Sequence, residues 1–175
     1  MRRLLISTLA LASLVSSARA QVDQMPRPGE MMAPFLSILL RGFEEPPTPY
    51  AAGHRGVDLA ASSGTPVVVG LEGQVTFAGQ VAGDLFVTID TPDPLKLTYS
   101  YLGSVLVSKG QWVTPGQILG TTGPGHSDRA EESLHLGLRV PDASILGGWR
   151  YVDPMPRLRK YLRRVRIPVV HLVRG

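Results

Sequence analysis

Short apolar runs separated by glycine or proline fill the middle of the chain. They recur about every 8–12 residues, a spacing typical of an antiparallel all-β domain. In the run at 73–79, alternation predicts that Val75 and Phe77 point to the same face. The chain is therefore expected to be mostly β, with an antiparallel β-sheet or sandwich core. The predicted strands cover residues 66–69, 73–79, 84–90, 97–102, 105–107, 110–113, 117–121 and 134–140.

Two segments, residues 109–117 and 134–140, each carry a more detailed prediction. Residues 109–117 are expected to form a hairpin, because the sequence at 114–116 is turn-forming. Residues 134–140 alternate strictly, so Leu134, Leu136 and Leu138 should enter the core from one face. His135 lies on the opposite face, which it shares with Ser133, Gly137 and Arg139.

The segments that flank the strands are less regular. Residues 35–43 are apolar and predict a buried strand or a short helix, between which length alone does not decide. Residues 44–50 are rich in proline and predict an extended loop. Residues 154–165 are apolar at 158, 161, 162 and 165, the spacing of an amphipathic helix, with proline near its first turn.

The first 20 residues have the pattern of a secretory signal peptide: a charged start, a short apolar run and a small-x-small ending at Ala20. The apolar run is short for a membrane span, which needs about 20 residues, although an uncleaved anchor is the alternative. The expected organisation is a signal peptide at 1–20, a linker at 21–34, one domain at 35–156 and a basic helix or tail at 157–175. Cleavage near Ala20 predicts a secreted or cell-envelope protein.

Charge and cysteine content narrow the expected partners. Residues 1–20 hold three arginines and no acid, so cleavage lowers the formal charge from +4 to +1. Residues 157–175 hold seven basic residues and no acid. On an exported chain this basic tail favours an anionic wall polymer or a membrane surface as partner, with a merely solvated helix face as the alternative. Nucleic acid is not expected as a partner.

The chain has no cysteine, so burial, a bound metal or both must stabilise it.

His54 and Asp58 are candidate metal ligands four residues apart. On one strand such positions point to the same face, so both side chains could reach one ion. Two ligands do not complete a stable site, and His135 offers a third from the polar face of its strand. Two histidines and one carboxylate form the ligand set of catalytic zinc sites, which keep a fourth position for water. Zinc is therefore the expected cofactor.

With these three candidate ligands, the chain resembles the lysostaphin-type zinc endopeptidases, which cut peptidoglycan cross-bridges. The resemblance covers residues 37–156 and is carried by both residues and spacing. The segments that match are Gly53-His54-Arg55-Gly56-Val57-Asp58, the hairpin glycines and valines of 107–120, Leu134-His135-Leu136 and Tyr151-Val152-Asp153-Pro154. The resemblance implies that His54, Asp58 and His135 bind zinc and that the substrate is a peptidoglycan peptide.

Two positions depart from the family pattern. The family carries a histidine where this chain has Ser133, and another where it has Tyr101. Both auxiliary catalytic histidines are therefore replaced. Tyr101 is a candidate donor to the oxyanion, and His126, in a glycine-rich loop, is a candidate general base, as are Glu131 and Glu132. The chain is also similar to divergent family members of high-GC Gram-positive bacteria, in which the same Gly-His loop precedes Leu-His.

Two functions follow from these expectations. The first is an exported zinc metalloendopeptidase that acts on peptidoglycan cross-bridge peptides. The second is a catalytically degenerate module that binds zinc or the cell wall and regulates other wall hydrolases. The three metal ligands favour the first function, because a scaffold has little need of converging ligands. Ser133 and Tyr101 favour the second.

Overall fold

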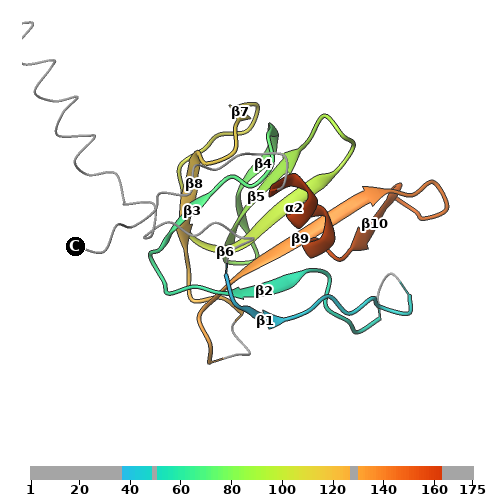
Figure 1. Cartoon of the computed structure of the whole chain (residues 1–175), viewed down its shortest axis with the longest axis horizontal. Helices are drawn as coiled ribbons and strands as arrows, with labels where there is room; N and C mark the ends of the chain where they lie inside the picture. Colours follow the sequence, from blue (N-terminus) through green and yellow to red (C-terminus); the bar gives the residue numbers. More distant parts are fainter. Residues whose placement is uncertain (1–36, 49–50, 127–129, 163–175) are drawn as a thin grey trace, which may run out of the picture. The chain divides into compact units, whose positions relative to one another are not determined.

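The computed structural model describes residues 37–48, 51–126 and 130–162. The predicted signal peptide, the predicted linker and residues 163–175 of the basic tail lie outside this part of the chain. Within it, strands predominate and one helix follows them (Figure 1). None of the described helical residues forms a segment long and apolar enough to cross a membrane. The elements are β1 (Leu39–Arg41), β2 (Val57–Ala60), β3 (Pro66–Val68), β4 (Gly73–Val81), β5 (Asp84–Asp90), β6 (Lys96–Val105), β7 (Trp112–Val113), β8 (Ile118–Thr122), β9 (Ser133–Pro141), β10 (Trp149–Val152) and α2 (Met155–Leu162).

All the strand pairings are antiparallel, which confirms the predicted fold class. The main path of the sheet runs β1-β2-β9-β6-β5-β4-β7. β10 pairs with β9, while β8 joins β6 to β3. The long strand β9 thus lies between β2 and β6, and its residue His135 stands opposite Asp58 on one side and Ser100 on the other.

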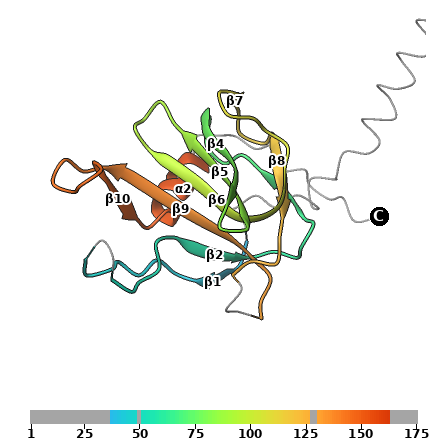
Figure 2. The ribbon, with the colours of Figure 1, turned by 180° about the vertical axis from the view of Figure 1, so that it is seen from behind.

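The two faces of β9 have different environments. Leu134, Leu136 and Leu138 are fully buried in the core, as their alternation predicts. The helix α2 lies in front of β9 in Figure 1 and behind it in Figure 2, so it covers only one face of this part of the sheet. Its residue Leu158 is buried in the same core cluster. The opposite face, which carries His135, is left available for a site.

The helix begins where the sequence pattern places it. Asp153 accepts a hydrogen bond from the backbone N–H of Met155 at 2.9 Å, which satisfies one of the free donors of the first turn. Leu158 supplies the buried apolar position that the pattern predicts. The side chains at 161 and 162, and all of residue 165, lie outside the described part.

The prediction that Val75 and Phe77 share a face is wrong. A bulge between them changes the register, since Val75 pairs with Ile89 and Phe77 pairs with Thr88. An extra residue in one strand shifts the alternation by one position. Val75 is consequently in the core, whereas Phe77 is 38% exposed on the other face.

Two further local predictions need correction. The turn at 114–116 is present, with the Gln117 N–H bonded to the Thr114 carbonyl at 3.1 Å. The flanking strands do not form a hairpin with each other, because β7 pairs with β4 and β8 pairs with β3 and β6. The apolar segment 35–43 contains the strand β1, but β1 is an exposed edge strand rather than a buried one, with Ile38 beside it 74% exposed.

Candidate metal centre

His54 lies just before β2 rather than within it. It forms an isolated bridge with Glu44, in which each backbone N–H bonds to the other residue's carbonyl at 2.9–3.0 Å. The chain then bends at Arg55 and Gly56 before β2 begins. The prediction that one continuous strand presents His54 and Asp58 is therefore wrong. Their side chains meet because the bend turns the imidazole back, and His54 Nε2 lies 3.1 Å from Asp58 Oδ1.

The register of β2 with β9 brings the third predicted ligand into place. Asp58 and His135 are directly opposite each other. His135 Nδ1 lies 2.8 Å from Asp58 Oδ1 and 3.2 Å from His54 Nε2. The three residues named from the sequence therefore converge, although 77 positions separate the aspartate from the second histidine.

His126 adds a fourth nitrogen to this group. Its Nε2 lies 3.2 Å from His135 Nδ1 and 3.3 Å from Asp58 Oδ1. One donor atom from each of the four residues, His54, Asp58, His126 and His135, lies within 4.8 Å of every other. The sequence singled out His126 as a candidate base, and the structure places it among the candidate ligands.

The arrangement of these atoms fits a bound cation. His54 Nδ1 lies 2.6 Å from the Gly42 carbonyl, so Nδ1 carries the proton and a neutral His54 ring presents a lone pair at Nε2. This nitrogen lies 3.1 Å from Asp58 Oδ1, so a proton or a metal cation must lie between the two atoms. Donors bound tetrahedrally to zinc are separated by roughly 3.3–3.4 Å. Five of the six separations among the four donor atoms are 2.8–3.3 Å, close to this value.

Asp58 is held as a carboxylate at this position. Burial by itself raises its pKa, but the hydrogen bond from His135 and the charges of His54, His135 and His126 outweigh burial and leave the pKa below its ordinary value. Its second oxygen, Oδ2, is buried with no hydrogen-bond partner. A buried anion is expensive without a compensating charge, which again fits a cation at Oδ1.

Gly56 makes room for the His135 ring. A Cβ atom at this position would lie 2.7 Å from His135 Nε2 and 2.4 Å from the Leu136 carbonyl oxygen. Any larger residue would displace either the imidazole or β9. The glycine between the two ligands of the Gly53–Asp58 segment is therefore required by packing.

The loop that carries His126 is packed directly on Ser133. Ser133 is buried, and its hydroxyl oxygen has no hydrogen-bond partner. A Cβ atom on Gly125 would lie 2.6 Å from that oxygen. The loop thus occupies the space above Ser133 into which a longer side chain would have to extend.

Tyr101 lies at the rim of the same cluster. Its ring centroid is 4.3 Å from that of His126 and 6.0 Å from that of His135. Its φ of 58° falls in the left-handed region, which is uncommon for a residue other than glycine and occurs most often at functional sites. The structure therefore brings both predicted catalytic residues, Tyr101 and His126, to the predicted metal ligands.

The two glutamates near the loop are placed differently. Glu132 accepts a hydrogen bond from the Ser63 N–H at 3.1 Å and is engaged there. Glu131 lines a cavity of about 90 Å³ together with Asp58, Ser133 and Leu40. Glu131 therefore lies closer to the candidate ligands than Glu132 does, on the side of Asp58 and Ser133.

A groove extends from His135 along the open face of the sheet. Its volume is about 490 Å³. Tyr101 and His135 lie on its lining, and Phe77 and Phe86 contribute apolar surface. Hydroxyl groups of Thr88, Thr98 and Ser100 belong to the strands β5 and β6 beneath it.

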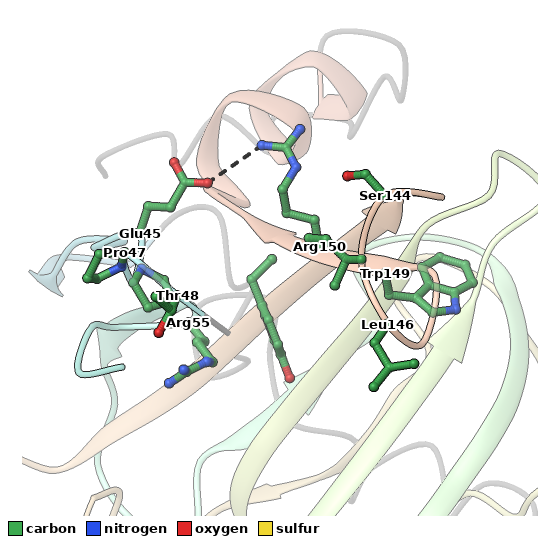
Figure 3. A pocket seen from close by; sticks show the side chains of 11 residues that line it. Glu45, Pro47, Thr48, Arg55, Ser144, Leu146, Trp149 and Arg150 are labelled. Carbon is green, nitrogen blue, oxygen red and sulfur yellow. Dashed lines mark ion pairs between the residues drawn. The ribbon is translucent and has the colours of Figure 1, made fainter. Parts of the chain in front are cut away.

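A second pocket of about 610 Å³ shares Arg55 and Tyr151 with this groove (Figure 3). Figure 3 shows Arg150 at its edge, paired with Glu45 at 3.7 Å. Arg150 also contacts Asp142 at 3.1 Å. The groove and this pocket adjoin each other, and together they extend the concave surface that begins at the metal cluster.

Comparison with known proteins assigns the chain to a family. Residues 52–154 match the model of Peptidase family M23. The chain belongs to peptidase family M23. It is 34% identical over 148 residues to Rv2891, an uncharacterized protein of Mycobacterium tuberculosis, with 84% of this chain and 57% of the relative covered. It therefore spans little more than half the length of that relative.

Solved structures of M23-like proteins are similar to the chain. The antimicrobial peptidase lysostaphin from Staphylococcus simulans is 26% identical with a TM-score of 0.60, covering 73% of this chain and 52% of lysostaphin. A zinc-containing peptidase from Vibrio cholerae is 27% identical with a TM-score of 0.52, covering 68% of this chain and 36% of that protein. The resemblance noted in the sequence is thereby confirmed.

Some features of this M23 site leave no signal in the sequence. The Gly42 carbonyl, which fixes the His54 ring, is a backbone atom and has no residue preference. The convergence of His126 depends on how its loop closes over Ser133, which spacing does not reveal. The glycine-histidine pair at 125–126 was the only available indication.

Proposed function

We propose that this M23 chain is an exported zinc metalloendopeptidase that acts on peptidoglycan cross-bridge peptides. The observation that carries the proposal is the convergence of His54, Asp58, His126 and His135 at one end of an open groove. M23 proteins act on peptidoglycan peptides, and the similar Vibrio cholerae structure is a zinc-containing peptidase. The expectation of export rests on the pattern of residues 1–20.

His54, Asp58 and His135 would hold the zinc, with His126 as a fourth donor or as a base beside it. Bound zinc in such sites activates a water molecule and polarises the scissile carbonyl. Gly42 fixes the tautomer of His54, so that a neutral ring presents its lone pair at Nε2. Phe86 packs against Tyr101, with ring centroids 5.8 Å apart, and restricts that side chain from the groove side.

During peptide cleavage, one residue of the chain would stabilise the oxyanion and another would accept the proton of the nucleophile. Tyr101 would donate a hydrogen bond from its hydroxyl to the oxyanion, a contribution typically worth about 10²–10³ in rate. His126 would accept the proton of the nucleophile, because its Nε2 lies beside the candidate ligands. These roles replace those that the family assigns to its two auxiliary histidines.

One observation favours the second function, a degenerate zinc- or wall-binding module. Sites in which four protein donors surround the metal are usually structural, whereas catalytic sites keep one position open. The present arrangement offers four donors. If His126 stays bound, the chain would hold zinc without cutting and would regulate other wall hydrolases instead.

Metal content and wall lysis, measured on the same sample of purified mature chain, separate the two functions. About one zinc per chain with a fall in turbidity of a cell-wall suspension supports the peptidase. Zinc without lysis supports the regulatory module. A chain that retains no zinc after dialysis contradicts both. An Asp58→Asn variant is the matched control, because it removes one negative charge and leaves the side chain the same size.

The basic tail is a separate part of the proposal. Residues 157–175 would attach the protein to an anionic wall polymer or membrane surface, an attraction that weakens with salt. A chain that ends at residue 162 should then bind cell walls less tightly at low salt than the full chain does. Equal binding of the two chains would remove residues 163–175 from the proposal and leave the peptidase unaffected.

A further inference from the structure

Arg139, in the groove that leads from the metal cluster, has no carboxylate partner among the described residues. It lies on β9 four residues after His135, on the same face of the strand. Its Nε is buried and makes no hydrogen bond, and no described carboxylate forms an ion pair with it. The guanidinium lies over the Tyr151 ring, 5.6 Å from its centroid. A buried charged donor left unsatisfied is costly, so the groove is prepared for an anion.

Two neighbouring cations, Lys96 and Arg150, have carboxylate partners. Lys96 stands opposite Arg139 in the sheet, but it pairs with Asp90 and lies over the Trp149 ring. Arg150 pairs with Glu45 at the edge of the adjoining pocket (Figure 3), and it also pairs with Asp142. Arg139 is therefore distinguished from both by its lack of an anionic partner rather than by its charge alone.

The lining of the groove strengthens this contrast. Arg55 contributes a second guanidinium, which donates to the Ala51 carbonyl at 3.0 Å. None of the described residues that line the groove is acidic. Gly137, between His135 and Arg139, is buried where the Arg55 backbone approaches β9, since a Cβ there would lie 3.2 Å from the Arg55 carbonyl oxygen. The same groove thus contains both His135, at the metal cluster, and Arg139.

We infer that Arg139 is a specificity residue that binds a free carboxylate of the substrate peptide, with Arg55 adding to the positive potential. Four residues of strand span about 13 Å, so the carboxylate would lie three to four residues from the scissile bond in an extended peptide. An arginine fork and a carboxylate can form two parallel hydrogen bonds, which makes the contact directional. The apolar surface of Phe77 and Phe86 would contact the uncharged part of the same peptide.

The inference rests on the proposed function, because it names the class of peptide that the site would take. That class is an acidic peptide, in contrast to an uncharged one such as a run of glycines. It makes no use of the cutting step. Binding can therefore be measured separately from cleavage.

Calorimetric binding of paired peptides to the zinc-loaded full chain tests the inference. One peptide series carries a single glutamate at successive positions, and the matched series carries glutamine. A charged hydrogen bond is worth enough for about a 10–100-fold difference in Kd. We expect one glutamate position to bind that much more tightly than its glutamine counterpart, with the difference shrinking at high salt.

Substitutions assign the effect to a residue. Arg139→Gln should abolish the preference for glutamate, while Arg139→Lys should retain part of it because the charge remains without the fork. Lys109→Gln is the control, since Lys109 is exposed just before β7 and does not line the groove. Its preference should equal that of the unaltered chain, and circular dichroism should show all three variants folded.

Three results would overturn the inference: equal Kd values for every glutamate–glutamine pair, no measurable binding of any acidic peptide, or a preference that survives Arg139→Gln. Failure of the proposed function looks different. Selective binding of the acidic peptide without cleavage refutes the peptidase and leaves the carboxylate site standing. Cleavage without any preference for the acidic peptide refutes the carboxylate site and leaves the peptidase standing.

Discussion

His126 Nε2 lies 3.3 Å from Asp58 Oδ1, within about half an ångström of the distances from Asp58 to the two other histidines. The loop histidine is therefore placed as a ligand as much as a base. The difference can be measured, since a ligand contributes to metal affinity and a base does not.

Replacing His126 by alanine should weaken zinc binding. Loss of a residue that only supports a ligand typically lowers affinity by about 10–100-fold, and loss of a direct donor should lower it at least as much. Competition with a chromophoric chelator measures the change. Glu132→Gln, in the same loop but bonded to Ser63, should leave affinity unaltered. If His126→Ala keeps full affinity and loses only cleavage, the histidine is a base and the fourth position belongs to water.

Removing the metal should destabilise the chain. A ligand that binds only the folded state adds about 4 kcal/mol when its concentration is a thousand times Kd. Chelation should therefore lower the Tm, and added zinc should restore it. The Tm of Asp58→Asn should respond little to either treatment, because one ligand is missing. A wild-type Tm that ignores chelation would show that the cluster binds no metal under these conditions.

Gly56→Ala should disrupt the site through packing alone. The new methyl group would lie 2.7 Å from His135 Nε2 and 2.4 Å from the Leu136 oxygen. Forcing such contacts typically costs about 1–3 kcal/mol and should also lower zinc affinity by moving His135. Gly42→Ala is the control, since nothing lies within 4 Å of its Cβ position and the carbonyl bonded to His54 is retained. Similar losses in both variants would show that the contacts of the new methyl group at residue 56 are not the cause.

Ser133→His restores the residue that the family carries, yet it should not restore activity. Gly125 lies against the Ser133 hydroxyl, so the larger ring must displace the His126 loop, at a cost of about 1–3 kcal/mol in unfolding free energy. Ser133→Ala should be close to neutral, because the hydroxyl has no partner to lose. Urea unfolding measures both changes. Faster wall lysis by the histidine variant would mean that the loop moves aside readily.

Tyr99 predicts how stability responds to alkaline pH. Burial raises the pKa of Tyr99, and the hydrogen bond from the Gly70 N–H lowers it only in part. In the unfolded chain tyrosine ionises near pH 10, so the unfolded state loses its proton first. The unfolding free energy should therefore be unaffected by this group below about pH 10 and should fall as pH rises above it.

Tyr99→Phe separates the two contributions of that residue. At pH 7 it should lower the unfolding free energy by about 1–3 kcal/mol, because the buried Gly70 N–H loses its acceptor. Above pH 10 its stability should fall less steeply than that of the unaltered chain. Urea unfolding at pH 7, 9 and 10.5 checks both statements, with Tyr151→Phe, a partly exposed tyrosine, as control. Parallel alkaline declines would assign the effect to other groups.

Much of this site can be predicted from the sequence because its chemistry is carried by side chains. The spacing of His54 and Asp58 and the alternation around His135 were sufficient to name three members of the cluster. The reason given for their convergence was wrong in part, since His54 precedes the bend before β2. Residue types reveal which atoms can bind a metal, whereas the path of the backbone between them depends on contacts with distant segments such as Glu44.

The fold class was also predictable, but several local features were not. Alternation identified the buried leucines of β9 and failed at Phe77, because a bulge depends on the partner strand as well as on the sequence. The turn at 114–116 was recognisable from its residues, yet the pairing of β7 and β8 is decided by the rest of the sheet. The unpaired state of Arg139 likewise follows from where Asp90, Glu45 and Asp142 lie, which no local pattern encodes.

The Gly42 carbonyl has a practical consequence for anyone who expresses this domain. It follows β1 and lies upstream of residue 52, where the match to the family begins. A fragment trimmed to the family boundaries would retain all four donor side chains and lose the acceptor that orients the His54 ring. The two tautomers of that ring would then compete, and only one of them presents a lone pair to the ion. We therefore expect that a fragment must begin at or before Gly42 to keep the His54 ring oriented, upstream of the limits that family membership alone would set.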